Sequence, residues 1–150
     1  MGKAADPVEL LRTARSVLLI DWPSRDVPDA LARAGLAVTA DEGPSNLVGY
    51  EIDGEAVTAR PLDRPPVRID VVYAHRPLAE LPGIAAQALA LAARAVWLQS
   101  GRNAVGAHDP RGCWLANHEA AMAREIVEAA GLLFVHQPYI GDVARGLAAD

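Results

Sequence analysis

The feature that most constrains the fold of this chain is an alternation of two sequence patterns along its length. Short runs rich in β-branched residues and leucine predict buried strands, whereas alanine-rich segments with helical spacing predict helices. Strands are expected at residues 16–21, 36–40, 69–74, 95–99 and 132–136. Helices are expected at residues 7–14, 26–34, 82–93 and 117–130, with a last helical turn starting near Tyr139. This order predicts an α/β fold in which helices cover both faces of a mainly parallel sheet, as one domain over residues 1–150.

One segment interrupts the alternation of strands and helices. Residues 48–59 alternate apolar and polar side chains around the pair Asp53-Gly54. An Asp-Gly pair favours a type I′ turn, because both central residues of that turn adopt positive φ. We therefore predict a β-hairpin over residues 48–59, added at an edge of the sheet.

Composition and charge limit the partners of the chain. It has 150 residues, 51% of them hydrophobic, and a formal net charge of -5 at pH 7. No block of lysine and arginine supplies the positive field that nucleic acids and anionic membranes require, so neither is expected as a partner. The single cysteine, Cys113, cannot form an internal disulfide, and the first residues lack the apolar run of a signal peptide. We expect a cytoplasmic protein.

Ligands of open parallel sheets bind beyond the carboxyl ends of the strands, so the residues that follow each strand are the candidates. The chain has no G-x-G-x-x-G pattern, and its only lysine is Lys3, which excludes the common dinucleotide and P-loop motifs. After the first strand, Ser24 and Arg25 can donate to an anion near the start of the next helix. The alternative is that Ser24 or Asp26 merely caps that helix.

The third and fourth predicted strands end in further polar residues. His75, Arg76 and Pro77 follow the third strand, and Arg76 is a candidate phosphate contact unless it only pairs with Glu80. Gln99, Ser100 and Gly101 follow the fourth strand and offer polar groups and close backbone approach. Trp97, within that strand, is interpreted as a core residue.

Residues 102–115 form the most irregular segment of the sequence. His108, Cys113 and His118 lie at intervals of five residues, which permits either zinc ligation or a nucleophile pair. The spacing matches no common zinc motif, so no metal is expected. The other interpretation is a lid or rim in which Trp114 packs over a ligand crevice.

The stretch of residues 69–101 resembles the standalone bacterial CoA-binding proteins, whose Rossmann-like domain also occurs in the succinyl-CoA synthetase alpha subunit. The motifs that carry the resemblance are the strand IDVV, the Arg76-Pro77 turn, the P-x-I helix start and the strand end WLQ-x-G, and AAGL at residues 129–132 is a further match. The resemblance implies a three-layer Rossmann-like domain and coenzyme A as the ligand. Two positions depart from the family pattern: Asp21-Trp22-Pro23-Ser24 replaces a Gly-Ser pair, and His136-Gln137-Pro138 replaces Asp-Arg-Cys.

These observations favour a small binding module for CoA or a related adenine nucleotide, without catalysis of its own. The predicted binding residues are Ser24, Arg25, His75, Arg76, Pro77, Gln99, Ser100 and Gly101. Two alternatives stay open: an enzyme that uses Cys113 with His108 or His118, and an interaction protein that forms a homodimer through the edge hairpin. An acidic Asp21 beside a phosphate would repel it unless the carboxylate faces away.

Overall fold

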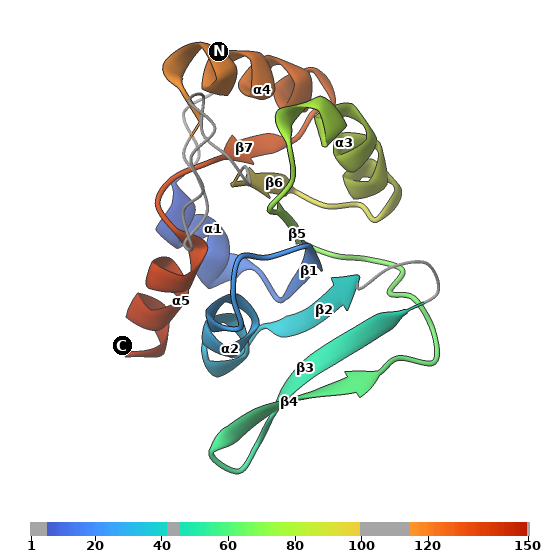
Figure 1. Cartoon of the computed structure of the whole chain (residues 1–150), viewed down its shortest axis with the longest axis vertical. Helices are drawn as coiled ribbons and strands as arrows, with labels where there is room; N and C mark the ends of the chain where they lie inside the picture. Colours follow the sequence, from blue (N-terminus) through green and yellow to red (C-terminus); the bar gives the residue numbers. More distant parts are fainter. Residues whose placement is uncertain (1–5, 42–45, 100–114, 150) are drawn as a thin grey trace.

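The computed structural model describes residues 6–41, 46–99 and 115–149 (Figure 1). Its helices are α1 (Pro7–Thr13), α2 (Asp26–Arg33), the short 3-10 helix η1 (Leu78–Glu80), α3 (Leu81–Ala90), α4 (Asn117–Ala129) and α5 (Ile140–Ala148). Its strands are β1 (Ser16–Ile20), β2 (Ala37–Asp41), β3 (Leu47–Asp53), β4 (Ala56–Pro61), β5 (Val71–Ala74), β6 (Ala95–Leu98) and β7 (Leu133–Val135).

The strands form one mixed sheet in the order β4-β3-β2-β1-β5-β6-β7. Strands β2, β1, β5, β6 and β7 are parallel to one another, whereas β3 and β4 are antiparallel to their neighbours. The predicted α/β class, the mainly parallel sheet and the edge position of the hairpin are confirmed. The chain goes from β1 to β2 on one side and later returns to β5 on the other, so the strand order reverses at β1.

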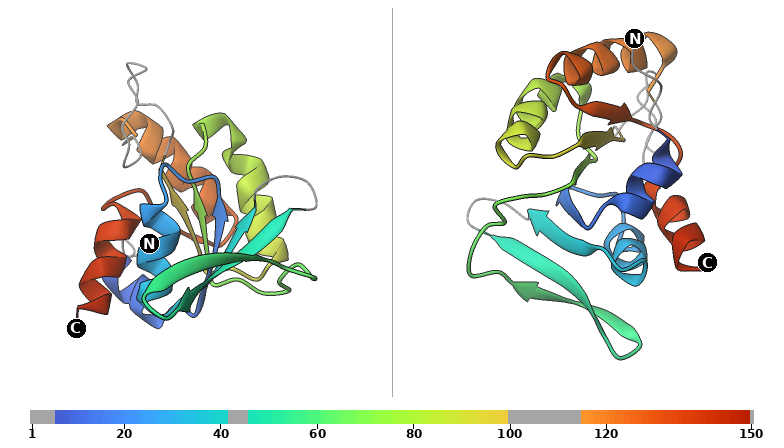
Figure 2. Two further views of the ribbon diagram at one scale, coloured as in Figure 1. Left: turned by 60° about the horizontal axis from the view of Figure 1, so that its bottom comes forward. Right: turned by 180° about the vertical axis from the view of Figure 1, so that it is seen from behind.

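Helices cover the two faces of the sheet and create two hydrophobic cores (Figure 2). Helices α1, α2 and α5 pack on one face over Val17, Leu19 and Trp97, and α3 and α4 pack on the other over Val72 and Phe134. Neighbouring residues of one strand supply opposite cores, because side chains alternate between the faces of a sheet. Trp97 is fully buried, as the sequence predicts.

The turn of the hairpin differs from the prediction. Asp53 pairs with Ala56, so the two central residues are Gly54 and Glu55 rather than Asp53 and Gly54. Among these residues only Gly54 has a positive φ, of 66°. A type I′ turn needs two such residues, and a positive φ at the first central residue alone is a property of type II′. The prediction of the type I′ turn is wrong because the register places Asp53 within the ladder.

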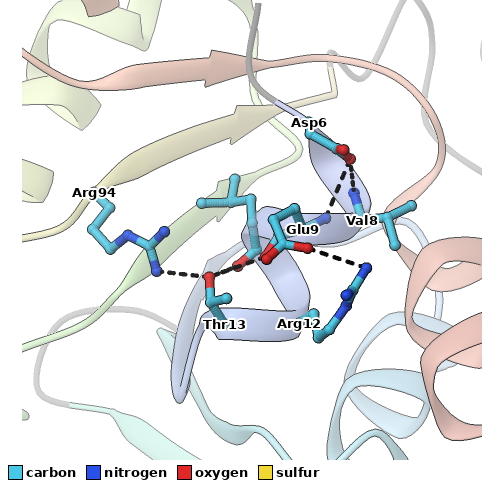
Figure 3. Close-up of polar contacts among 7 residues, drawn as sticks. Asp6, Val8, Glu9, Arg12, Thr13 and Arg94 are labelled. Atoms are coloured by element: carbon cyan, nitrogen blue, oxygen red, sulfur yellow. Dashed lines mark hydrogen bonds and ion pairs between the residues drawn. The ribbon is translucent and has the colours of Figure 1, made fainter.

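Glycine and aspartate set several helix ends. The Asp6 carboxylate accepts the N–H groups of Val8 at 3.1 Å and Glu9 at 3.2 Å, which caps α1 (Figure 3). Gly35 and Gly131 follow α2 and α4 with φ of 91° and 83°. Helix α3 ends at Ala90, three residues earlier than predicted, and the chain then turns at Ala92 with a φ of 57°.

Candidate functional site

The reversal of strand order places the loops after β1 and β5 side by side. Ile20 and Ala74, the last residues of these strands, are register partners, and Ala74 in turn pairs with Leu98 at the end of β6. The N–H of His75 donates to the carbonyl of Ile20 at 3.1 Å, and the N–H of Gln99 donates to that of Ala74 at 2.8 Å. The backbone ladder therefore continues past the strand ends and fixes His75 and Gln99 at the position where open parallel sheets bind ligands.

Arg76 lies at this edge between two carboxylates. Its Nε and Nη2 donate to the two oxygens of Glu80 at 3.0 and 2.6 Å, and its Nη1 lies 3.3 Å from Asp21 Oδ2. The bond to Glu80 raises the pKa of Arg76 and lowers the pKa of Glu80. The pairing with Glu80 that the sequence offered as an alternative is thus present, and Asp21 faces the same cation.

Asp21 adopts an uncommon backbone conformation directly after β1. Its φ is 62°, which among residues with side chains Asn and Asp tolerate best. One carboxylate oxygen accepts the N–H of Trp22 at 2.9 Å, while the other faces Arg76. The Asp21 carboxylate therefore does not turn away from the crevice, and it competes with an incoming anion for Arg76.

Arg25 is engaged with the hairpin. Its Nε donates to Asp29 at 2.9 Å, its Nη2 donates to the carbonyl of Val57 in β4 at 2.5 Å, and its guanidinium lies 5.0 Å from the centre of the Tyr50 ring. Arg33 of α2 reaches another hairpin carbonyl, that of Glu55, at 2.7 Å. These bonds occupy acceptors that a further strand would need at the β4 edge.

The alternative of a simple side-chain cap on α2 is wrong. The cap residue of α2 is Arg25, and no side-chain hydrogen bond caps the helix. Asp26 instead accepts the Tyr139 hydroxyl at 2.8 Å and two bonds from Arg145 Nη1 at 2.6 and 2.7 Å. Burial and the bond to Asp26 raise the pKa of Tyr139 to about 12.

The contacts of Asp26, Tyr139 and Arg145, which we call the Asp26 cluster, were missed by sequence reasoning. They join the loop after β1 to α5 across more than one hundred residues, and no local spacing announces them. The glycine at position 141 is explained by these contacts: a Cβ there would lie 2.6 Å from Tyr139 Cε2 and 2.8 Å from Asp26 Oδ2. The cluster depends on that glycine.

Buried polar groups lie behind this edge. The Tyr73 hydroxyl donates to Gln99 Oε1 at 2.8 Å, and burial raises the pKa of Tyr73. Gln99 and Trp97 are both 0% exposed. Within residues 6–41, 46–99 and 115–149, Gln99 Nε2 and Trp97 Nε1 have no hydrogen-bond partner. A buried donor without an acceptor carries a large desolvation cost.

Several predicted residues fall outside the described part of the chain. These residues are Ser100, Gly101, His108, Cys113 and Trp114. His118 is described and lies exposed in the first turn of α4. The structure brings His75, Arg76 and Gln99 to neighbouring strand ends, and Pro77 follows Arg76 as the cap residue before η1. Ser24 lies in the loop before α2, whereas Arg25 is held by the hairpin.

Comparison with known proteins decides the family. The model of the CoA binding domain matches residues 20–141, from the end of β1 to the first turn of α5. The chain belongs to the CoA binding domain family. The match includes the candidate residues from Ser24 to Gly101, so this CoA binding domain carries its candidate site within the matched region. Neither the curated proteins nor the solved structures contain a significant match to the chain.

Two further observations concern the described residues of this CoA binding domain. No helix among them combines the length and the apolar character needed to cross a bilayer. In the same residues, no three side chains of His, Cys, Asp or Glu gather closely enough to hold a metal ion.

Proposed function

We propose that this protein is a single-domain binding module for CoA or a related adenine nucleotide, without chemistry of its own. The observation that carries the proposal is the match of the CoA binding domain over residues 20–141, which includes the edge where the strand order reverses. In open α/β sheets this edge is the ligand site, because loops diverge there and leave a crevice.

The roles follow from the chemistry at the strand ends. Arg76 supplies the cation for a phosphate group, and His75 and Gln99 line the same edge. Pro77, Ser100 and Gly101 follow these residues in the chain, and Ser24 and Arg25 belong to the loop after β1.

Binding of a phosphate requires a rearrangement at Arg76. The guanidinium makes two bonds to Glu80 but only one contact, at 3.3 Å, to Asp21. The single longer contact is the weaker one, since paired bonds between a guanidinium and a carboxylate are stronger than single ones. We infer that a ligand phosphate takes the place of Asp21 at Nη1 while Glu80 keeps the side chain oriented.

Isothermal titration calorimetry tests the proposal with CoA, acetyl-CoA, ADP and NAD as separate ligands. We expect saturable heat with at least one of them and an affinity about tenfold or more lower in Arg76→Gln, because a charge-assisted bond to phosphate is lost. Arg60→Gln is the matched control, since Arg60 is an exposed arginine that pairs with Glu51 on the hairpin. Absence of heat with every ligand contradicts the binding function, and equal affinity in both variants moves the site away from Arg76.

A further inference from the structure

A second polar cleft lies at the opposite end of the sheet, where β1, β5 and β6 begin. It has a volume of about 470 Å³. Its lining is polar throughout and consists of Thr13, Arg15, Ser16, Arg68, Asp70 and Arg94. Figure 3 shows Arg94 extending to Thr13 at the end of α1, and the Arg94 Nη1 to Thr13 Oγ1 distance is 3.1 Å. We call this feature the arginine cleft.

The arginine cleft differs in charge balance from the rest of the described surface. Most of the described arginines outside the cleft have a carboxylate oxygen within 3.3 Å: these are Arg12, Arg25, Arg60, Arg76, Arg124 and Arg145. The exceptions are Arg33, which donates to the carbonyl of Glu55, and Arg64, and these two do not share a cleft with other arginines. In the arginine cleft, Arg68 lies 3.9 Å from Asp70, and neither Arg15 nor Arg94 has a carboxylate partner among the described residues. Three guanidinium groups thus share one carboxylate in a protein whose net charge is -5.

Asp70 acts mainly as a structural anchor in this cleft. It is 8% exposed, its Oδ2 accepts the backbone N–H of Arg15 at 2.7 Å, and its own N–H donates to Ser16 Oγ at 3.0 Å. These bonds tie the start of β1 to the segment before β5. The arginine side chains of the cleft are exposed around this fixed base and have two positive charges in excess of the carboxylate.

We propose that the arginine cleft is a binding site for a phosphate dianion, either inorganic phosphate or the phosphate group of a small monoester. A phosphate monoester carries a charge of about −1.5 to −2 at neutral pH, which matches the excess positive charge of the cleft. Guanidinium groups bind phosphate oxygens through paired N–H donors. The Ser16 hydroxyl, whose oxygen accepts the Asp70 N–H, keeps its proton for a further bond to the anion.

The arginine cleft is independent of the proposed CoA crevice. Its residues precede strands β1, β5 and β6, whereas the crevice residues follow them, so the two sites lie at opposite ends of the same strands. Arg76→Gln should therefore leave phosphate binding in the arginine cleft unchanged. Failure of one site does not imply failure of the other.

The test is a titration of the full chain that is monitored through its amide NMR signals at constant ionic strength. One arm uses inorganic phosphate and the other uses glycerol 3-phosphate. We expect saturable shifts of the Arg15, Ser16 and Arg94 amides in at least one arm. In Arg15→Gln and Arg94→Gln the dissociation constant should rise about tenfold or more. Arg12→Gln is the control, because Arg12 is an exposed arginine of α1 that pairs with Glu9 and does not line the cleft.

Each outcome of this titration decides the proposal. Saturation by both probes supports recognition of the phosphate group alone, and saturation by glycerol 3-phosphate only identifies an ester as the ligand. Shifts that grow linearly with concentration indicate screening by counterions and overturn the proposal. Equal dissociation constants in Arg15→Gln, Arg94→Gln and Arg12→Gln also overturn it, provided that the amide spectra show all three variants folded.

Discussion

The arginines at the two ends of the sheet differ in their carboxylate partners. At the carboxyl ends of the strands, Arg76 is held by Glu80 and Asp21, and Arg145 by Asp26 and Asp142. At the amino ends, Arg15 and Arg94 have no carboxylate partner in the described structure. A ligand phosphate must compete with paired carboxylates for each arginine at the first end, whereas at the second end only Asp70, 3.9 Å from Arg68, opposes three arginines. The difference predicts that internal carboxylates lower the affinity for a phosphate at the carboxyl ends of the strands.

The largest effect is expected at the carboxyl ends of the strands, where a substitution of Gly141 disrupts the Asp26 cluster. In Gly141→Ala the new methyl group would collide with the Tyr139 ring and the Asp26 carboxylate. We expect a loss of about 1–3 kcal/mol in the free energy of unfolding, as for overpacked cores. Chemical denaturation measures this change.

The matched control for Gly141→Ala is Gly146→Ala on the same helix. A Cβ at Gly146 meets no atom within 4 Å, and alanine favours a helix interior over glycine. We expect this variant to equal the wild type in stability or to gain up to about 1 kcal/mol. Equal losses in both variants would show that α5 rejects any methyl group and that the cluster has no special dependence on Gly141.

The next prediction concerns the Asp21 carboxylate, which competes with a ligand for Arg76. Asp21→Asn keeps the side-chain shape and tolerates the positive φ, but it leaves Arg76 with Glu80 alone. We expect the affinity for CoA to rise up to about fivefold, the upper range of one exposed charge interaction of about 1 kcal/mol. Calorimetric titration of the two proteins gives the ratio. An affinity that falls in Asp21→Asn would assign Asp21 a direct role in ligand binding.

The smallest expected effect concerns His136, directly after β7. Burial, and secondarily the charge of Arg124, lowers the pKa of His136 below its ordinary value of 6.5. Below pH 6.5 the unfolded chain binds this proton more readily than the folded chain does. His136 therefore does not reduce the free energy of unfolding above pH 6.5. That free energy decreases as the pH falls from 6.5 through the pKa of His136 in the folded state.

Thermal unfolding between pH 7 and pH 5 measures this contribution. His136→Gln should lose less stability on acidification than the wild type, because the pH-dependent group is gone. His118→Gln is the control, since His118 is exposed on α4, and it should follow the wild type. Identical pH profiles for all three proteins would contradict the role of His136.

How far the sequence predicts this molecule depends on the range of the interactions. The helices around Asp6, Gly35 and Gly131 and the edge hairpin follow from local patterns, and the structure has them. The candidate residues His75, Arg76 and Gln99 also follow from a local rule, because each comes directly after a predicted strand.

Local sequence patterns do not predict the long-range contacts that set the charge at the two ends of the sheet. The approach of Asp21 to Arg76 depends on the pairing of β1 with β5, and Asp26 meets Arg145 only through the packing of α2 on α5. The arginine cleft collects residues from before three strands, of which no two form a motif in sequence. Local spacing accounts for the pairs Arg76–Glu80 and Arg145–Asp142, whereas tertiary packing decides the contacts of Arg76 with Asp21 and of Arg145 with Asp26.

A titration of the full chain with CoA, followed by amide NMR, tests the central claim most directly. We predict saturable shifts of the Trp22, His75 and Gln99 amides at the carboxyl ends of the strands, and their loss or weakening in Arg76→Gln. Saturable shifts that avoid these three amides, or no saturable shift anywhere in the chain, would contradict a CoA site at the reversal of strand order.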